Sequence, residues 1–337
     1  MLNKLFVQLS ADIGLDRYLV QGAGDNTSLK ENNMMHIKAS GKWLANAKKE
    51  DIFVLVDSRK VQQNIKGIKD DPLKGALIGK TNLRPSIETT LHALMPHNVV
   101  VHTHPVQLLN WLVLEDGQKR LTKVLKDVNW AWVPYARPGV ELTYEVQKAM
   151  YNRHVDVILL GNHGLVVGGE NCSVVSSLMD RVLNRCKTSS RGAHSKYDHA
   201  IEELAGILKM RLPRHNQIHS LALDHISYKY CNNKNGILYP DQAVFLGSKM
   251  PCYDGEMNKE GVASYLEENG SMPFIILKGR GVLVSLDAKI DVDEMLLCHS
   301  EILRRIGDNE TLSYLTEREV GRLLNWDLEK YRQTMDK

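Results

Sequence analysis

The sequence predicts an α/β or α+β sandwich, and two features of the chain support this prediction. Short apolar segments such as Ile52–Val56 and Val99–Val101 alternate with longer segments in which apolar residues recur at helical spacing. At 337 residues, the chain is also long enough for two domains, each with a core of its own. We therefore expect a larger domain over residues 1–205 and a smaller α/β domain over residues 206–337.

The elements of the first domain follow from apolar periodicity and from capping and turn residues. Apolar side chains recur at helical spacing over residues 1–18, and Ser86 is a suitable N-cap for a helix over residues 88–95. The glycine-containing segment 21–30 is typical of a turn-rich loop, and the polar segment 58–82 of a surface excursion. The other expected elements are strands over 34–41, 52–56, 99–104 and 156–167 and helices over 107–113, 117–127, 141–154 and 173–188.

Composition narrows the classes of partner. The chain has 43 basic and 40 acidic residues, and its net charge of +3 gives no reason to expect nucleic acid or an anionic membrane. The 5 cysteines have no C-x-x-C spacing, which favours free thiols in a reducing compartment. No apolar run approaches the length of a membrane span, and polar residues interrupt any signal-peptide core at the N-terminus. We therefore expect a cytoplasmic protein.

Two histidines follow Val99–Val101 at alternate positions. In a strand, His102 and His104 would project from the same face about 7 Å apart, close enough to bind one metal ion. A third histidine, His163, follows another apolar segment, and Glu88 precedes the expected helix. Three neutral imidazoles, completed by a carboxylate or water, make an open catalytic site of the zinc type. The competing interpretation is a chance His-x-His pair on a polar strand face.

These residue types also suit a particular chemistry. Proton removal next to a carbonyl, or retro-aldol cleavage, generates an enediolate, whose charge a metal stabilises as a Lewis acid. A carboxylate such as Glu88 is a suitable base for that step. The route through a Schiff-base lysine has little support, because no lysine is flanked on both sides by apolar strand residues. The H-E-x-x-H arrangement of metalloproteases is also absent from the sequence.

Five segments now give a specific resemblance. In chain order they are QGAGDNTSLK, IKASG, RPSIETTLHA, VVVHTHP and GNHGLVVGG. Over about residues 10–190 they resemble the class II aldolase/adducin family, and within it the fuculose- and rhamnulose-phosphate aldolases and their longer two-part relatives. The resemblance implies a three-layer α/β/α sandwich around a largely antiparallel sheet. It also implies a divalent metal, namely Zn²⁺ or another ion such as Mn²⁺, Co²⁺ or Fe²⁺.

The family's functional residues map onto positions of this chain. His102, His104 and His163 match the three metal-ligating histidines, and Glu88 matches the glutamate that acts as the general base. The residues at the positions where the family holds a substrate phosphate are Asn26, Ser40, Gly41 and Ser86. Asp25 departs from the family's phosphate loop, so either the sugar is unphosphorylated or Asp25 points away from it. No tyrosine follows the metal strand at the spacing of the family's general acid.

The function that follows is a metal-dependent carbohydrate lyase, an aldolase that cleaves a ketose or ketose phosphate. A same-site epimerase, dehydratase or decarboxylase acting on a sugar or sugar acid is an alternative, and so is a non-catalytic, adducin-like scaffold. Single-domain relatives form tetramers, so we expect a homo-oligomer, either a dimer or a tetramer.

The second half of the chain contains a segment that resembles part of the first half. Residues 158–167 align without gaps with residues 275–284, and a helical segment follows each. Arg280 then stands at the position of His163, and a guanidinium, which never deprotonates, cannot bind a metal cation. We infer that residues 216–310 are a degenerate copy of part of the first domain, without metal. Two helices are expected over residues 312–335.

Overall fold

The structure of the protein is a computed structural model that describes residues 2–67, 71–256, 258–270 and 272–327. These residues form two compact units that divide between Lys187 and Thr188. The division lies upstream of the expected boundary at 205/206, because Arg191 is bound within the second unit. Its guanidinium donates to Asp224 Oδ2 and to the Leu303 carbonyl. No helix within the described ranges is long and apolar enough to cross a membrane.

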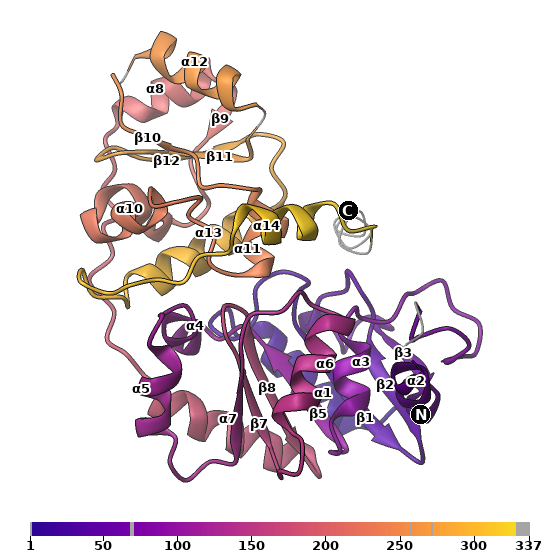
Figure 1. Cartoon of the computed structure of the whole chain (residues 1–337). Coiled ribbons are helices and arrows are strands. Elements are labelled where there is room, and N and C mark those ends of the chain that lie inside the picture. The colour runs from indigo at the N-terminus through magenta and orange to yellow at the C-terminus, as the bar shows by residue number, and fades with distance from the viewer. Residues whose placement is uncertain (1, 68–70, 257, 271, 328–337) are drawn as a thin grey trace. The chain divides into compact units, whose positions relative to one another are not determined.

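A large sheet forms the centre of the first unit. Among the described residues its eight strands lie in the order β4-β3-β2-β1-β5-β8-β7-β6 (Figure 1). Neighbouring strands are antiparallel, except for the parallel pair β6 and β7, which confirms the mostly antiparallel sheet that the family resemblance implied. The strands are β1 (Asn26–Glu31), β2 (Met34–Lys38), β3 (Phe53–Asp57), β4 (Leu77–Ile78), β5 (Val99–Thr103), β6 (Trp130–Val133), β7 (Val157–Leu160) and β8 (Gly164–Gly169).

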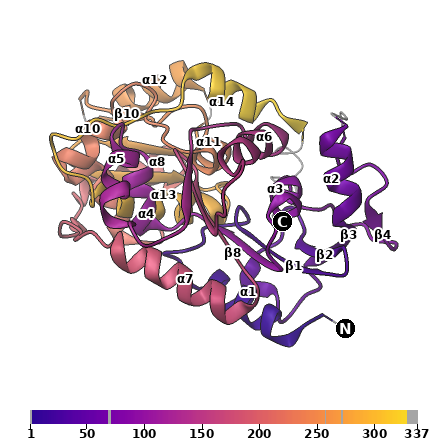
Figure 2. The same cartoon turned by 60° about the horizontal axis from the view of Figure 1, so that its bottom comes forward.

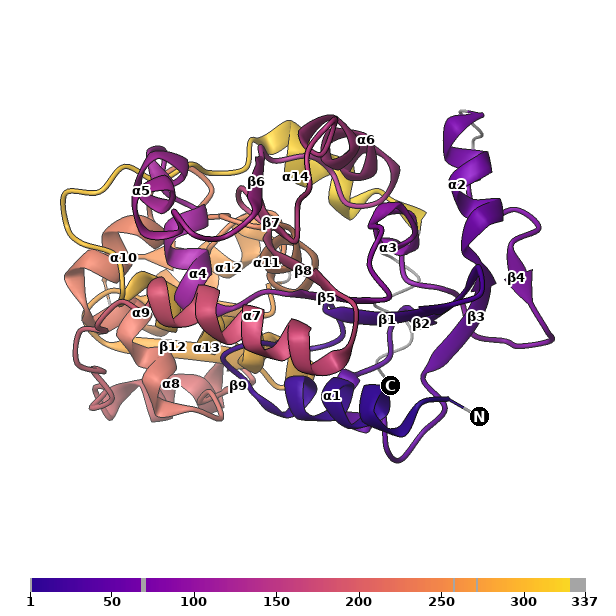
Figure 3. The ribbon, with the colours of Figure 1, turned by 90° about the horizontal axis from the view of Figure 1, so that it is seen from below.

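Helices cover both faces of this sheet. Two of them, α1 and α7, lie side by side on one face (Figure 2), whereas α2, α3 and α6 lie on the other (Figure 3). The three-layer α/β/α sandwich is thus confirmed. The helices of this unit are α1 (Lys4–Leu15), α2 (Ser58–Lys66), α3 (Thr89–Leu94), α4 (Val106–Leu112), α5 (Gly117–Val124), α6 (Val140–Ala149) and α7 (Cys172–Arg185), with a short 3₁₀ helix at Leu44–Asn46.

β7, β8 and the first three residues of β5 carry no polar side chain because both faces of these strands are covered. Val100 and Val166 project toward α3 and α6, where they join Leu91 and Val146 in one core cluster. The residues that alternate with them on the opposite face are buried as well. β5, the strand that contains His102, is therefore packed on both faces.

Two expected surface segments contain regular structure instead. The expected loop 21–30 includes β1, in which the polar residues 26–28 are buried because β1 pairs with β2 on one side and β5 on the other. The expected excursion 58–82 includes α2, which buries Val61 and Ile65 against the sheet. In both segments tertiary packing outweighs a polar local composition.

The expected single strand over 156–167 is a hairpin. β7 and β8 pair antiparallel with Leu160 opposite Gly164, so His163 lies in the connecting turn. Asn162 has a left-handed φ of 52°, a conformation that asparagine tolerates better than most residues. This turn places His163 beyond the ends of the strands rather than within one of them.

The second unit contains a smaller sheet with helices on both faces. Its strands lie in the order β10-β11-β12-β9 (Figure 1). The strands are β9 (Met210–Arg211), β10 (Cys252–Tyr253), β11 (Phe274–Leu277) and β12 (Gly281–Ser285). The helices are α8 (Ala200–Ile207), a 3₁₀ helix (Asn216–His219), α9 (Ser220–Leu223), α10 (His225–Cys231), α11 (Pro240–Leu246), α12 (Lys259–Asn269), α13 (Ile290–Leu303) and α14 (Glu317–Leu324).

The core of the second unit and the end of the chain complete the fold. Ile275, Leu277 and Leu283 pack against α8 and α12 in one cluster. Of the two helices expected over residues 312–335, one is α14, and the expectation for residues 328–335 lies outside the described part of the chain. All five cysteines are described, and all are thiols rather than disulfides.

Candidate metal centre

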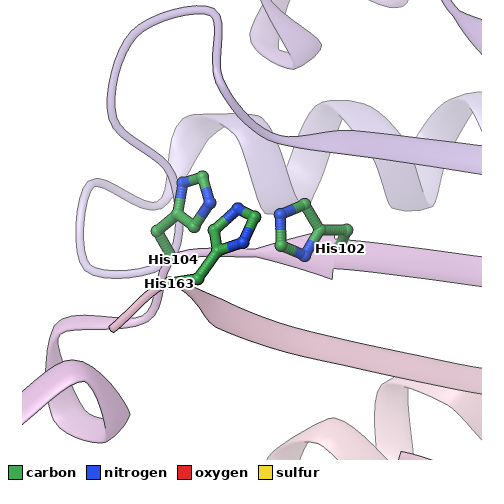
Figure 4. Close-up of side chains that lie close together, drawn as sticks. All are labelled: His102, His104 and His163. Atoms are coloured by element: carbon green, nitrogen blue, oxygen red, sulfur yellow. The ribbon is translucent and has the colours of Figure 1, made fainter. Parts of the chain in front are cut away.

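Three histidine side chains converge where β5 ends. His102 belongs to β5, His104 lies just beyond it, and His163 comes from the turn between β7 and β8 (Figure 4). One ring nitrogen of each histidine lies within 4.8 Å of those of the other two, and all three residues are buried. The ring centroids are 4.8 to 5.3 Å apart. The structure thus brings together the pair expected from strand alternation, His102 and His104, and the third candidate, His163.

Local structure explains the convergence. His102 and His104 project to the same side because side chains alternate along an extended chain. β8 pairs with β5, with Thr103 opposite Leu165, so the turn that carries His163 lies beside the end of β5. Gly164 permits this approach, because a Cβ atom there would lie 2.6 Å from His104 Cδ2. A larger residue at position 164 would push the imidazoles apart.

Glu88 brings a carboxylate to the same place. It is buried directly before α3, and its Oε2 lies 3.2 Å from His102 Nε2 while its Oε1 lies 3.5 Å from His163 Nε2. Asn26 lies opposite His102 across β1 and β5, and its amide donates to Glu88 Oε2 at 2.9 Å. The amide thus orients the carboxylate toward the imidazoles.

The hydrogen bonding of His102 is that of a metal ligand. Its Nδ1 lies 3.0 Å from the Leu165 carbonyl oxygen, and since a carbonyl only accepts, Nδ1 carries the proton. The Nε2 atom of the neutral ring then presents a lone pair toward the Glu88 carboxylate. Two electron-rich atoms 3.2 Å apart are stabilised by a positive charge between them. The donor set therefore fits a divalent cation.

Asp25 contacts His104, and the sequence did not reveal this contact. It is buried, and its Oδ1 accepts from the His104 backbone N–H at 2.8 Å and lies 3.3 Å from His104 Nδ1. A carboxylate on the far nitrogen of a ligating histidine fixes the ring and raises its basicity. Of the two alternatives left open for Asp25, the structure favours the one in which it points away from a substrate phosphate, because Oδ1 faces His104 and Oδ2 accepts from the Gln21 backbone N–H at 3.2 Å.

The other expected substrate-binding residues lie in two neighbouring segments. An antiparallel β-bridge pairs Ala39 with Pro85, so Lys38 lies opposite Ser86 and Ser40 lies opposite Arg84, whose carbonyl accepts from the Ser40 N–H at 2.8 Å. The Ser86 hydroxyl accepts from the Glu88 backbone N–H at 3.2 Å. Ser86 therefore helps to position the base as well as lying in the expected anion-binding segment.

Lys38 connects these segments to the glycine loop. It is 1% exposed, and its ammonium donates to the Ala23 carbonyl at 2.9 Å and to the Lys42 carbonyl. A buried lysine that donates to two carbonyls holds two loops in a fixed arrangement and places a positive charge beneath them. The alternating pattern of β2 indicates that one face is buried, but it does not identify these partners.

His92 lies one helical turn after Glu88 but has a different environment. Its Nδ1 lies 2.7 Å from the Ser28 hydroxyl. Burial, together with the nearby His102 and Lys30, holds the pKa of His92 well below its usual value. His92 is therefore a neutral, hydrogen-bonded core residue that supports the strand beside the site.

Comparison with known proteins agrees with this architecture. The profile of the family described as Class II Aldolase and Adducin N-terminal domain matches residues 5–189, more than half of the chain. The chain therefore belongs to the class II aldolase and adducin family. This confirms the resemblance carried by the five sequence segments.

Individual relatives cover mainly this part of the chain's length. The chain is 34% identical over 173 residues to the uncharacterized oxidoreductase YuxG of Bacillus subtilis, a match spanning 47% of this chain but 25% of that protein. It is 30% identical over 163 residues to the L-fuculose phosphate aldolase of Methanococcus vannielii, spanning 46% and 77% of the two chains. A solved N-terminal class II aldolase domain of a conserved Thermoplasma acidophilum protein is 26% identical, covers 55% of this chain and 93% of that one, and has a TM-score of 0.49.

Proposed function

We propose that the first unit is a metal-dependent lyase, an aldolase that cleaves a ketose or ketose phosphate. Family membership and the relatives named L-fuculose phosphate aldolase support an enzyme of this class. The observation that carries the proposal is the position of Glu88, whose two carboxylate oxygens lie 3.2 and 3.5 Å from the Nε2 atoms of His102 and His163. A base beside three imidazoles is the arrangement that carbon–hydrogen activation next to a carbonyl requires.

The roles of the side chains follow from this placement. A divalent cation held by His102, His104 and His163, for which we propose Zn²⁺, would supply Lewis acidity that stabilises negative charge on the substrate oxygens. In the condensation direction, Glu88 removes a proton from the carbon next to the carbonyl. In the cleavage direction, Glu88 returns that proton after the carbon–carbon bond has broken. Asn26 keeps the carboxylate aimed by donating to Oε2.

Substrate binding is proposed for the segments around the base. Asn26, Ser40, Gly41 and Ser86 offer amide and hydroxyl donors to a phosphate or sugar hydroxyl, and the buried ammonium of Lys38 lies beneath the same loops. The ligand class is therefore a small sugar or sugar phosphate. We further propose that the protein acts as a homo-oligomer, either a dimer or a tetramer.

The same site would also serve an epimerase, a dehydratase or a decarboxylase acting on a sugar. An adducin-like scaffold is disfavoured, since a scaffold has no physical need for three converging imidazoles and a buried carboxylate. Metal analysis of the purified protein separates the scaffold from the enzymes.

The function is tested by Glu88→Ala, assayed for aldehyde release from a panel of ketose phosphates and free ketoses. We expect the variant to keep most of its metal but to lose turnover by at least about a hundredfold, the usual contribution of a general base. Glu145→Ala, which removes an exposed carboxylate from α6, is the matched control and should change neither quantity. Undiminished turnover in Glu88→Ala would remove Glu88 from its role as base.

A further inference from the structure

We propose that His97, His154 and Asp156 form a second divalent-cation site, near the start of β5 and thus away from the strand end that carries His102. One donor atom from each of the three residues lies within 4.8 Å of the other two. His97 precedes β5, and both His154 and Asp156 precede β7. A cation there would join two segments that are far apart in the sequence.

The two imidazoles converge on one oxygen. The Nε2 atoms of His97 and His154 each lie 2.9 Å from Asp156 Oδ1. Zinc bound to two imidazole nitrogens and one carboxylate oxygen at about 2.0–2.2 Å separates neighbouring donor atoms by roughly 3.3 Å. A cation would therefore replace the shared protons once each imidazole nitrogen lies a few tenths of an ångström farther from Asp156 Oδ1.

The carboxylate is held in place for this role. Asn129 donates to its other oxygen, Oδ2, at 3.1 Å, which leaves Oδ1 to the imidazoles. The Asp156 main chain is also fixed, since its N–H donates to the Asn129 carbonyl at 2.9 Å and its carbonyl accepts from Gly168 N–H at 2.8 Å. Burial raises the pKa of Asp156, but the hydrogen bonds from His97 and Asn129 outweigh it and leave the pKa below its usual value. The ligand is thus ionised at neutral pH.

Gly168 provides the space for His97. A Cβ atom at position 168 would lie 2.2 Å from His97 Nδ1, so only glycine lets the imidazole lie against β8. The His97 side chain is 8% exposed, whereas that of His154 is 71% exposed. The site thus combines one fixed imidazole with one that can move aside, and the latter gives a cation an entry path.

The surface around His154 leaves the entry path for a cation open. His154 and Asn129 line a surface hollow of about 500 Å³ together with Trp130 and Arg153. Three protein ligands next to an open hollow leave a coordination position for water or another small donor. The chemistry of two imidazoles and one carboxylate favours a first-row divalent ion, and zinc is the probe of choice.

The test counts zinc in the full-length protein by equilibrium dialysis against zinc sulfate after chelator treatment. We expect the natural sequence to bind two equivalents of zinc per chain and His163→Ala to bind one. The double variant His163→Ala with His154→Ala should bind none. In the His163→Ala background, loss of His154 should raise the zinc Kd by at least about tenfold. Because the His154 side chain is 71% exposed, its removal should not disturb folding.

The controls separate this site from the first one. His199→Ala, which removes a histidine side chain that is 87% exposed and pairs with Glu202 in the second unit, should leave both equivalents bound. If His154→Ala binds as much zinc as the natural sequence with the same Kd, the second site is refuted. If His163→Ala instead leaves the count unchanged while His154→Ala lowers it, the second site stands and the metal centre of the proposed lyase fails.

Discussion

The hairpin formed by β7 and β8 in the first unit and the hairpin formed by β11 and β12 in the second share the same strand pairing but carry different turn residues. In the first, Val157 pairs with Val167 and Leu160 with Gly164; in the second, Phe274 pairs with Val284 and Leu277 with Gly281. The turn residue before His163 has a φ of 52°, and the one before Arg280 has a φ of 68°. The two turns thus place different side chains at one equivalent position.

The similarity extends beyond the hairpins. The half-sheet β5-β8-β7-β6 and the sheet β9-β12-β11-β10 share strand order, and in each the last pair is parallel and the others antiparallel. Ile158 and Leu160 pack toward α3 and α6, and the aligned Ile275 and Leu277 pack toward α8 and α12. This correspondence supports the proposal that the second unit is a degenerate copy of half of the first.

The register then identifies what replaces the ligands. Val101 pairs with Val167, and Arg211 pairs with the aligned Val284, so Leu212 and Arg214 stand where His102 and His104 stand in the first unit. Asp198, two residues before α8, forms an ion pair with Arg280. Its counterpart in the first unit is Glu88, which directly precedes α3 and lies 3.5 Å from His163. The guanidinium of Arg280 neutralises the Asp198 carboxylate without a metal ion. The comparison teaches that this half-sheet forms without the three imidazoles, so their presence in the first unit reflects chemistry rather than folding.

The largest expected effect comes from moving the residue of the second turn into the first. His163→Arg should reduce bound metal from about one equivalent per chain to below about 0.1, because a protonated guanidinium repels a cation and donates no lone pair. The fold should persist, since the second unit tolerates arginine at the equivalent turn. Metal analysis in the His154→Ala background isolates the first site, and far-ultraviolet circular dichroism checks the fold.

The reciprocal change, Arg280→His, is the control. It should bind no more metal than the parent protein, because Leu212 and Arg214 still stand at the other two positions of the second unit. If His163→Arg keeps its metal, the turn residue does not account for the difference between the two units. If Arg280→His gains metal, the second unit can bind a cation with only one imidazole at these positions.

A smaller effect concerns acid sensitivity of the second unit. His219 is buried, its Nδ1 accepts from the Val282 N–H at 3.1 Å, and burial lowers its pKa from 6.5 to about 4. The unfolded chain binds a proton near pH 6.5 while the folded chain does not, so stability is complete above that pH and falls as the pH drops toward 4. The loss amounts to about 3 kcal/mol from this group.

Urea unfolding of the natural sequence and of His219→Asn at pH 7 and pH 4.5 measures this loss. Asparagine retains an acceptor for Val282 but does not titrate in this range, so the variant should lose less stability on acidification than the natural protein. Other buried histidines such as His299 contribute equally to both proteins. Equal losses in the two proteins would contradict the assignment to His219.

The convergence of His102, His104 and His163 and the sandwich fold were predictable from the sequence for identifiable physical reasons. Alternation in β5 places His102 and His104 on one face whatever the rest of the fold. His163 and Glu88 were candidates from their positions after an apolar segment and before an expected helix, and the family segments supplied their expected roles. The antiparallel sheet came from the resemblance, because periodicity alone does not define strand order.

The residues that were missed depend on long-range contacts. Asp25 lies 79 positions from His104, and nothing local to either residue indicates that they meet. β6 was not expected at all, although its Trp130–Val133 segment pairs with β7. The hairpin turn had a local signal in Gly161, Asn162 and Gly164, residues typical of tight turns. That signal was obscured by the apolar residues on both sides, which suggested one continuous strand.

The smallest expected effect concerns the ion pair between Arg280 and Asp198, at the position equivalent to the proposed metal centre. The side chains of Arg280 and Asp198 are 49% and 30% exposed, and exposed pairs contribute little to stability. Arg280→Ala should therefore shift the thermal midpoint by no more than about 1 °C. Arg211→Ala in the same unit is the contrast, since it removes a partner from the fully buried Asp293 and should cost about 3 kcal/mol or more. If Arg280→Ala is as destabilising as Arg211→Ala, the ion pair stabilises the second unit. The turn position would then have a structural role in the second unit, at Arg280, and the proposed catalytic role in the first, at His163.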